Sequence, residues 1–421
     1  MENKKKKGLS LKAILQFVVL CAGATSIYMP VYSRTSFYDA FIESFQVSNT
    51  QFATMFSTYT LFTLLTYFLG GVVADKIPPR KLLAFSFLST GALTFWQLQF
   101  PSYGVAVFIY GAMGVTTTLT FWAALIKATR QFGQMVGGES KALGSLEGGR
   151  AITNMLLSTF CVWLFAQAAS SMAGLRSTLI VYCAALVICG LGAWFVFDDD
   201  DQSEEAVSKD SLPKLILECM KNKYVWVCCF VVMGAYAMTA TLNGYVSSIA
   251  NACFSLSAVT AAAVTVIGMY VQPFGSFGGG WLGDKIGASK TIILSVAGLI
   301  IASFIITVLP ASAAMAVPFV IVYLFFTIFM SCVRGQFYAP LREIGIPMYL
   351  SGTATGLIAT IGYSPDLFLP LITGRLLDTM DAVAAYKIVI YILIGFGIFS
   401  IVMASLIVAH VKRTGKSEQA E

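Results

Sequence analysis

The amino-acid sequence predicts an all-α membrane protein with twelve transmembrane helices in two pseudo-symmetric six-helix bundles. Hydrophobic residues make up 57% of the chain and charged residues 11%, whereas ordinary soluble domains carry about 25% charged residues. Uncharged runs of about 20 residues recur along the chain, which is the length of an α-helix that crosses a bilayer. Because backbone groups in lipid must pair within their own segment, these runs predict helices, and not barrel strands of about 10 residues.

The apolar runs define six expected helices in each half. In the first half they cover 11–33, 50–74, 80–100, 103–127, 141–168 and 174–196. In the second half they cover 223–248, 257–283, 289–309, 313–337, 350–375 and 384–410. We therefore expect an N-terminal bundle over 1–196, a cytoplasmic linker over 197–222 and a C-terminal bundle over 223–421. The apolar spacing in 212–221 suggests a short helix on the membrane surface, with a solvated loop as the alternative.

The distribution of lysine and arginine predicts the orientation, because cytoplasmic loops carry an excess of basic residues. One set of loops holds Lys4 to Lys7, Lys12, Lys76, Arg80, Lys81, Lys127, Arg130, Lys141, Lys285, Lys290, Arg342, Lys412, Arg413 and Lys416. The opposite set holds only Arg34, Arg176, Arg375 and Lys387. We expect a multi-pass protein of the bacterial inner membrane with both termini in the cytoplasm.

This topology predicts the location of inserted reporter tags. Tags at Gln202 and at the C-terminus should both report the cytoplasm, because six helices would separate the two positions. A tag near Ser102 should report the periplasm, since an odd number of helices precedes it. Opposite locations for the first two tags would contradict the twelve-helix arrangement.

The two halves share a short repeat in corresponding loops. Gly71-Val-Val-Ala-Asp-Lys-Ile-Pro-Pro-Arg-Lys81 follows the second expected helix, and Gly280-Trp-Leu-Gly-Asp-Lys-Ile-Gly-Ala-Ser-Lys290 follows the eighth. Both resemble the cytoplasmic loop signature of the major facilitator superfamily, which is approximately Gly-x-x-x-Asp-Arg/Lys-x-Gly-Arg-Arg/Lys. The first copy departs from it at Pro78-Pro79 and the second at Ala288-Ser289.

The resemblance covers essentially the full chain and implies the major facilitator fold. It further implies a secondary active transporter that works by alternating access, with a substrate site near the midplane between the halves. The segments 142–150 and 334–340 resemble a bacterial subgroup of metabolite symporters. In this family the signature aspartate steadies the outward-open state against a helix start, which for the first copy would be the helix that Ser351 caps. The resemblance thus implies gating roles for Asp75, Lys76, Arg80, Asp284 and Lys285.

Ionisable residues at membrane depth are functional candidates, because an unpaired charge there costs several kcal/mol. Glu147 and Arg150 are spaced to pair with one another, so proton coupling and substrate binding compete with a structural ion pair. Asp366 follows a proline in the eleventh helix and is predicted to carry protons, with a structural hydrogen bond as the alternative. Arg334 and Arg34 are expected to bind an anion unless they snorkel to the interface.

Aromatic and amide side chains complete the candidate substrate site, although packing also explains each one alone. They are Tyr28, Tyr32, Trp122, Asn154, Tyr236, Asn243 and Tyr363. We expect a monomer in the lipid bilayer that moves a small carboxylate or sugar acid with protons or another coupling ion. The alternatives are an organic anion/phosphate antiporter, a neutral sugar or drug efflux transporter, and a non-transporting membrane sensor.

Other classes of protein lack their sequence signatures. The chain has one histidine, His410, and its nine cysteines lack metal-like spacing, so we expect no enzyme, cofactor or metal site. The segment Gly287-Ala-Ser-Lys-Thr291 lacks the glycine that precedes lysine in a phosphate loop, which counts against ATP drive. The basic residues are scattered over short loops, so we expect no nucleic-acid partner.

Overall fold

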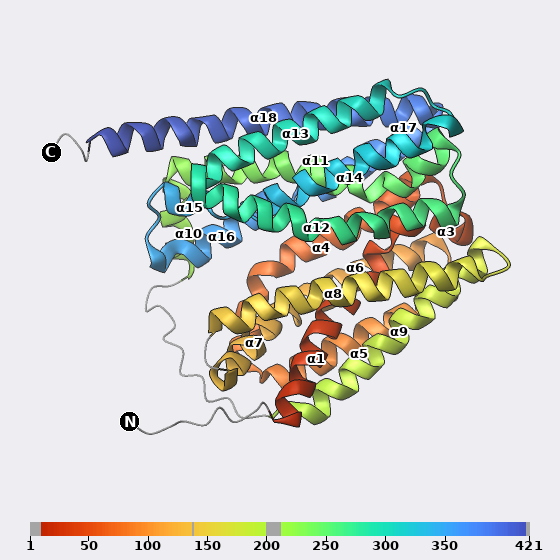
Figure 1. Cartoon of the computed structure of the whole chain (residues 1–421). Helices are drawn as coiled ribbons and strands as arrows, with labels where there is room; N and C mark the ends of the chain where they lie inside the picture. Colours follow the sequence, from red (N-terminus) through yellow and green to blue (C-terminus); the bar gives the residue numbers. More distant parts are fainter. Residues whose placement is uncertain (1–9, 137–138, 199–211, 418–421) are drawn as a thin grey trace. The chain divides into compact units, whose positions relative to one another are not determined.

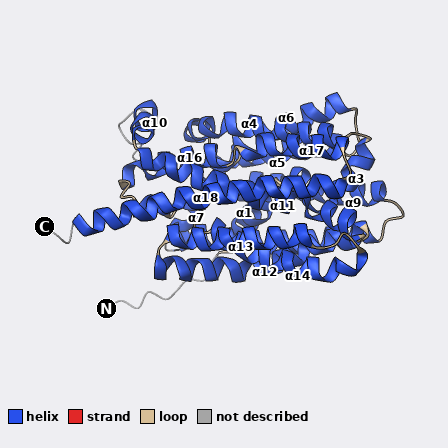
Figure 2. Cartoon of the chain, turned by 90° about the horizontal axis from the view of Figure 1, so that it is seen from above, coloured by secondary structure: helices blue, strands red, loops and turns tan. Residues whose placement is uncertain are grey.

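The computed structural model describes residues 10–136, 139–198 and 212–417, and every regular element in these ranges is a helix (Figure 1, Figure 2). Ten helices of this part are long and apolar enough to cross a membrane. They cover Leu11–Tyr32, Tyr103–Gly133, Gly144–Ala166, Ser171–Val196, Lys223–Phe254, Ala258–Ile286, Ala288–Val308, Ala313–Arg334, Leu350–Thr379 and Ala382–Arg413. Helices α4 (Asn49–Lys76) and α5 (Pro79–Gln97) lie where the second and third spans are predicted.

The chain divides into two compact units, which are described separately. The first unit contains Met1–Ser33 and Thr58–Ser203, and the second contains Arg34–Ser57 and Glu204–Glu421. The segment Arg34–Ser57 thus belongs to the second unit, although the chain on both sides of it belongs to the first.

The first unit contains seven whole helices of the described chain and the later part of α4. They are α1 (Leu11–Ser26), α2 (Met29–Tyr32), α5, α6 (Tyr103–Thr118), α7 (Trp122–Val136), α8 (Glu139–Ala166) and α9 (Ser171–Val196). The most extensive contact joins α5 to α9, and α1 lies against both α8 and α9. Phe87, Phe121 and Leu186 are fully buried in this core. Gly23 of α1 leaves the space that the Phe87 ring fills, because a Cβ there would lie 2.2 Å from the ring.

The second unit contains the remaining helices and the start of α4. They are α3 (Arg34–Phe45), α10 (Leu212–Lys221), α11 (Lys223–Phe254), α12 (Ala258–Ile286), α13 (Ala288–Val308), η1 (Ala313–Met315), α14 (Ala316–Arg334), α15 (Pro340–Glu343), α16 (Met348–Gly362), α17 (Pro365–Thr379) and α18 (Ala382–Ser417). Within this unit α11 and α13 both run alongside α18 (Figure 1). A Cβ at Gly234 of α11 would lie 2.5 Å from the Phe396 carbonyl oxygen, so glycine permits this close packing.

The first predicted helix differs from the observed structure at its end. The apolar run expected over 11–33 is divided into α1 and α2, with Pro30 in the short second helix. The chain then continues into α3, which has a kink at Phe37. Arg34, expected at the outer end of one helix, is therefore the first residue of another.

Two predictions about helix ends meet different outcomes. The short helix predicted at 212–221 is present as α10, but its buried residues Leu215 and Cys219 lie on protein, since α10 packs against α16. The capping role of Ser351 is wrong, because α16 begins at Met348 after Pro347 and Ser351 lies within the helix.

Helix α13 begins at the place where the second signature copy departs from the family pattern. The backbone amide of Ser289 donates a hydrogen bond of 3.2 Å to the Glu343 carboxylate, and its hydroxyl also contacts that carboxylate. A carboxylate at a helix start pairs amides that have no partner within the helix. Glu343 of α15 therefore caps α13 at the residue that replaces an arginine of the signature.

Candidate functional site

A buried carboxyl group lies among tyrosines in the second unit. Asp366 is only 4% exposed, and its Oδ2 accepts a hydrogen bond of 2.7 Å from the Tyr236 hydroxyl of α11. The rings of Tyr236 and Tyr363 have centroids 4.5 Å apart. The Tyr363 hydroxyl lies 2.7 Å from that of Tyr338. These four side chains form a connected cluster of polar groups, which we call the Asp366 cluster.

The helix break that places Asp366 has a local cause. Pro365 lacks an amide hydrogen, so it cannot pair the carbonyl of Ile361 one turn earlier. The Ser364 hydroxyl donates a hydrogen bond of 2.7 Å to this carbonyl. Helix α17 therefore starts anew at Pro365, with Asp366 in its first turn. The sequence predicts the break from the proline, and the structure shows that a neighbouring serine pairs the carbonyl.

A buried cation lies in the same unit and belongs to the start of α3. Arg34 is 3% exposed, and its guanidinium carbon lies 3.6 Å from the centroid of the Phe56 ring and 5.6 Å from that of Tyr245. Rings at this distance attract a cation through their π faces. A Cβ on Gly244 would lie 3.2 Å from the guanidinium. Arg34 is thus enclosed by protein, so the alternative that its side chain snorkels to the interface is wrong.

The charge of Arg34 has no ion-pair partner among the residues that the structure describes. The Asp366 carboxyl lies within electrostatic reach of Arg34 and, more weakly, of Arg334. Arg334 is the last residue of α14, and its side chain is exposed. The second unit therefore brings two cations within electrostatic reach of one buried carboxyl group. Another candidate of this unit, Asn243, accepts a hydrogen bond of 2.9 Å from Tyr323.

The first unit places three further candidates together on α7 and α8. Arg150 forms an ion pair of 2.7 Å with Glu147, as their spacing predicts, and its guanidinium carbon lies 5.7 Å from the centroid of the Trp122 ring. The side chain of Glu147 is 66% exposed, whereas that of Arg150 is 23% exposed. Within the described chain the Arg150 Nε is buried without a hydrogen-bond partner.

The remaining candidates of the first unit are tyrosines and an amide. The rings of Tyr28 and Tyr32 meet edge to face with centroids 6.4 Å apart, and Tyr32 meets Tyr59 in the same way at 5.9 Å. The Tyr28 hydroxyl donates to a backbone carbonyl at 3.4 Å. Asn154 accepts a hydrogen bond of 3.4 Å from Ser158, one turn further along α8.

The candidate gating residues lie near the ends of their helices. The side chains of Asp75 and Lys76 lie outside the described residues. Arg80 donates from Nε to the Trp194 carbonyl at 2.7 Å, and its guanidinium carbon lies 4.7 Å from the centroid of the same tryptophan ring. The Lys285 amine lies 4.8 Å from the centroid of the Trp281 ring, and Asp284 is exposed.

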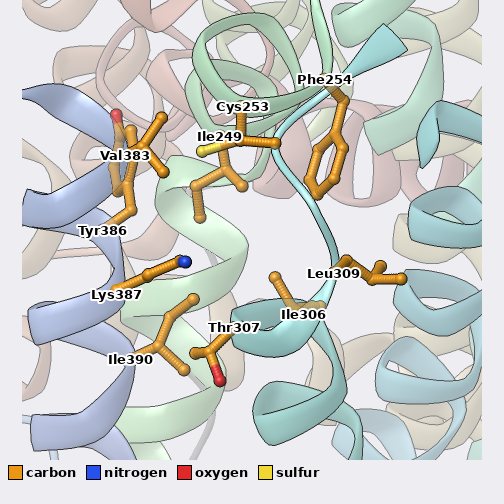
Figure 3. A pocket seen from close by; sticks show the side chains of 11 residues that line it. Ile249, Cys253, Phe254, Ile306, Thr307, Leu309, Val383, Tyr386, Lys387 and Ile390 are labelled. Atoms are coloured by element: carbon orange, nitrogen blue, oxygen red, sulfur yellow. The ribbon is translucent and has the colours of Figure 1, made fainter. Parts of the chain in front are cut away.

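Two pockets within the units are unsuited to a polar substrate. The pocket in Figure 3 lies between α11, α13 and α18, and Lys387 points into it among mostly apolar side chains. Its volume of about 10 Å³ is room for about one water molecule. A pocket of about 580 Å³ in the first unit is lined mainly by apolar side chains of α4, α5 and α6, such as Phe62, Phe85 and Phe108. Neither pocket contains a predicted substrate-binding residue.

The helical fold and the intramembrane polar groups define a membrane transporter. Residues 17–370 match the family model of the Major Facilitator Superfamily, so the chain belongs to this superfamily. This confirms the predicted fold class and the prediction that the protein is a transporter and not an enzyme. It is a multi-pass membrane protein.

Two curated relatives are inner membrane proteins of Escherichia coli K12. The chain is 28% identical to inner membrane protein YqcE over 354 residues, which cover 81% of each chain. It is 26% identical to inner membrane protein YihN over 415 residues, which cover 96% of this chain and 97% of YihN.

Solved structures share the fold at low sequence identity. The nucleoside transporter NupG superposes with a TM-score of 0.75 at 13% identity, covering 95% of this chain and 99% of NupG. The D-xylose–proton symporter superposes with a TM-score of 0.68 at 14% identity, covering 94% and 96% of the two chains.

Three members of the observed clusters are absent from the sequence-based selection. Tyr338 lies inside the segment 334–340 that resembles the symporter subgroup, so the motif contained the signal for it. Tyr245 lies nine residues after Tyr236 on the same helix, which a search for further aromatic residues on α11 could have found. Phe56 contacts Arg34 across 22 positions of sequence, and no local pattern indicates that contact.

Proposed function

We propose that this protein moves a small organic anion, such as a carboxylate or sugar acid, across the membrane together with protons. The observation that supports this proposal is the buried Arg34, which has ring contacts but no carboxylate partner in the described chain. Arg34 shares a hydrogen bond with the Tyr245 side chain, but a buried charge without an ion-pair partner still costs several kcal/mol. A bound substrate anion would offset part of this cost.

The proposed anion site uses more than one cation. Arg34 and Arg334 would bind the carboxylate, because both lie within electrostatic reach of the Asp366 carboxyl. Arg150 is a further candidate cation for the substrate, because a carboxylate can compete with Glu147 for its guanidinium. Guanidinium groups suit this role, since they can form paired hydrogen bonds with a carboxylate.

Proton coupling follows from the position of Asp366. When this carboxyl is ionised, its negative charge repels a substrate anion that approaches Arg34. When it is protonated, the positive charge of Arg34 is available to the substrate. Protonation and anion binding would therefore favour one another, and such coupling is reciprocal by thermodynamic linkage.

The tyrosine hydroxyls favour a hydroxylated anion over a purely apolar one. Tyr236, Tyr363 and Tyr338 present hydroxyl groups beside the carboxyl group, and such groups can exchange hydrogen bonds with sugar hydroxyls. Among the structural neighbours, NupG is a nucleoside transporter and another is a D-xylose–proton symporter. Nucleosides and D-xylose both carry hydroxyl groups, which supports a sugar acid. The cytoplasmic termini, the monomeric state and the gating roles of the two signature copies are part of the same proposal.

A ligand screen tests the substrate class. Purified protein is heated with sugar acids, with neutral sugars of matched size and with simple dicarboxylates, each at pH 5.5 and pH 7.5. A ligand that binds the native state raises the melting temperature, and we expect the largest rise for an acid at the lower pH. A rise for neutral sugars alone would contradict the anion proposal.

Flux measurements in proteoliposomes complete this test. We expect the acid identified by the screen to accumulate when the pH gradient is imposed, and accumulation to stop when a protonophore removes that gradient. Equal uptake with and without the pH gradient would contradict proton coupling. Stabilisation by a ligand that is never taken up would favour the sensor alternative.

A further inference from the structure

The segment Arg34–Ser57, which we call the docked segment, lies in the second unit although its two ends continue into the first. It consists of α3 and the start of α4, and α3 packs against α11 and α12. It also supplies both Arg34 and Phe56, the cation and the ring that lies closest to it. Whatever holds this segment in place therefore also holds the proposed anion-binding group.

Asp378 of α17 binds the first turn of α4. Its Oδ1 accepts hydrogen bonds from the Asn49 backbone amide at 2.9 Å and from the Asn49 side chain at 3.0 Å, and its Oδ2 accepts one from the Thr50 amide at 2.8 Å. The first amides of a helix have no partner within it, and a carboxylate there is favoured by charge as well. Asp378 thus acts as the cap of a helix that is distant in sequence.

The helices at this contact approach closely. A Cβ on Gly374, one turn before Asp378, would lie 2.6 Å from the Asn49 carbonyl oxygen. An added methyl group would therefore push α17 and the start of α4 apart. The cap and the close approach occur on the same turn of α17, so they act on the same junction.

Two other polar contacts hold α3 in the same unit. The Ser36 hydroxyl lies 2.6 Å from that of Thr265 on α12, and the Ser248 hydroxyl of α11 donates to Asp39 at 2.7 Å. Ser36 and Thr265 are both buried. These contacts lie on α3, away from Asp378 along the chain, so they report on the docked segment as a whole.

We propose that Asp378 is a positioning residue for transport, which holds the docked segment on the second unit and thereby keeps Arg34 in its ring enclosure. The carboxylate bonds to three donors of the segment, and each of these bonds is lost when the segment leaves. A contact that exists in one state alone biases the equilibrium between states. Only the effect on substrate affinity rests on the proposed function; docking itself does not.

The test measures how often the segment leaves, without any substrate. Ser36→Cys places a thiol at a buried position that a water-soluble maleimide reaches only when the segment is displaced. Asp378→Asn keeps the shape of the side chain but removes the charge and one acceptor. Loss of a helix cap should raise the labelling rate about three- to thirtyfold. The protein without Ser36→Cys gives the background, because eight of its native cysteines are buried and Cys183 is half-buried.

Asp381→Asn is the matched control. Asp381 lies three residues after Asp378, and it caps its own helix α18 through the amides of Val383 and Ala384. Its replacement should leave the labelling of Ser36→Cys unchanged. An equal rise in Asp378→Asn and Asp381→Asn would contradict the proposal, because it would show general loosening of this end of the unit.

A second variant keeps the proposal testable if Asp378→Asn fails to fold. Gly374→Ala leaves the carboxylate intact but crowds the Asn49 carbonyl, and it should also raise the labelling rate. If the folded variants are labelled at the same rate as the protein that carries Ser36→Cys alone, the proposal is overturned. In counterflow, Asp378→Asn should weaken apparent substrate affinity and Asp378→Glu should restore part of it. Faster labelling with unchanged affinity would overturn the link to Arg34. Weaker substrate affinity without faster labelling would overturn the docking role of Asp378.

Discussion

Replacing Asp366 by asparagine should abolish accumulation driven by a pH gradient while leaving substrate counterflow largely intact. Asparagine keeps an oxygen that can accept the hydrogen bond from Tyr236, so the Asp366 cluster should remain assembled. It has no proton to gain or lose, so the coupled step cannot occur. Accumulation and counterflow can both be measured with the same proteoliposome preparation. We expect a complete loss of accumulation against the substrate gradient.

Glu147→Gln is the control for this prediction. Glu147 is the other candidate for proton coupling, but its side chain is 66% exposed and paired with Arg150. Its replacement should leave accumulation within about twofold of wild type, because an exposed ion pair contributes about 0–1 kcal/mol. Normal accumulation in Asp366→Asn would refute the proton-coupling role of Asp366. Loss of accumulation in Glu147→Gln would assign proton coupling to Glu147.

Replacing Arg34 by alanine should reduce the affinity for the substrate anion about tenfold to hundredfold, because it removes charge-assisted hydrogen bonds worth about 1.5–3 kcal/mol. Arg34→Lys should recover only part of the loss, since an ammonium cannot reproduce the planar guanidinium that lies over the Phe56 ring. Arg334→Ala should show a loss of the same kind. Calorimetric titration of the purified variants measures these affinities.

Arg176→Ala provides a matched control, because Arg176 is also a cation over a ring. Its guanidinium carbon lies 5.2 Å from the centroid of the Phe100 ring in the first unit, and its side chain is exposed. Its removal should leave affinity unchanged. Normal binding by both Arg34→Ala and Arg334→Ala would refute the anion proposal and favour a neutral polyol or sugar.

The helices could be predicted from sequence because the length and composition of each apolar run indicate a helix that crosses the membrane. Composition and run length are local properties, and the proline before Asp366 locates the break in the eleventh helix. The buried surroundings of Asp366 also follow from its depth in a membrane helix. The serine that pairs the freed carbonyl is one residue away and could have been found in the same way.

The surroundings of Arg34 could not be predicted, because they depend on contacts between distant segments. A cation at the end of an apolar run usually snorkels. The sequence gives no sign that α3 packs against α11 and α12 of the second unit. The capping role expected for Ser351 fails for a different and local reason, because it rests on residue type alone. Its helix begins three residues earlier, after a proline that can itself start a helix.

Helix α4 joins the contact at Asp378 to the first copy of the signature. It is a single helix of 28 residues, and it contains no proline. From Asn49 to Leu69 it also has no glycine, so this stretch behaves as a stiff rod of roughly 30 Å at 1.5 Å per residue. Gly70-Gly71 then precede Asp75, which is where such a rod can bend. We therefore expect a displacement of Asn49 to move the helix as far as the glycine pair. The strength of the Asp378 cap would then influence when the Asp75 end of α4 moves.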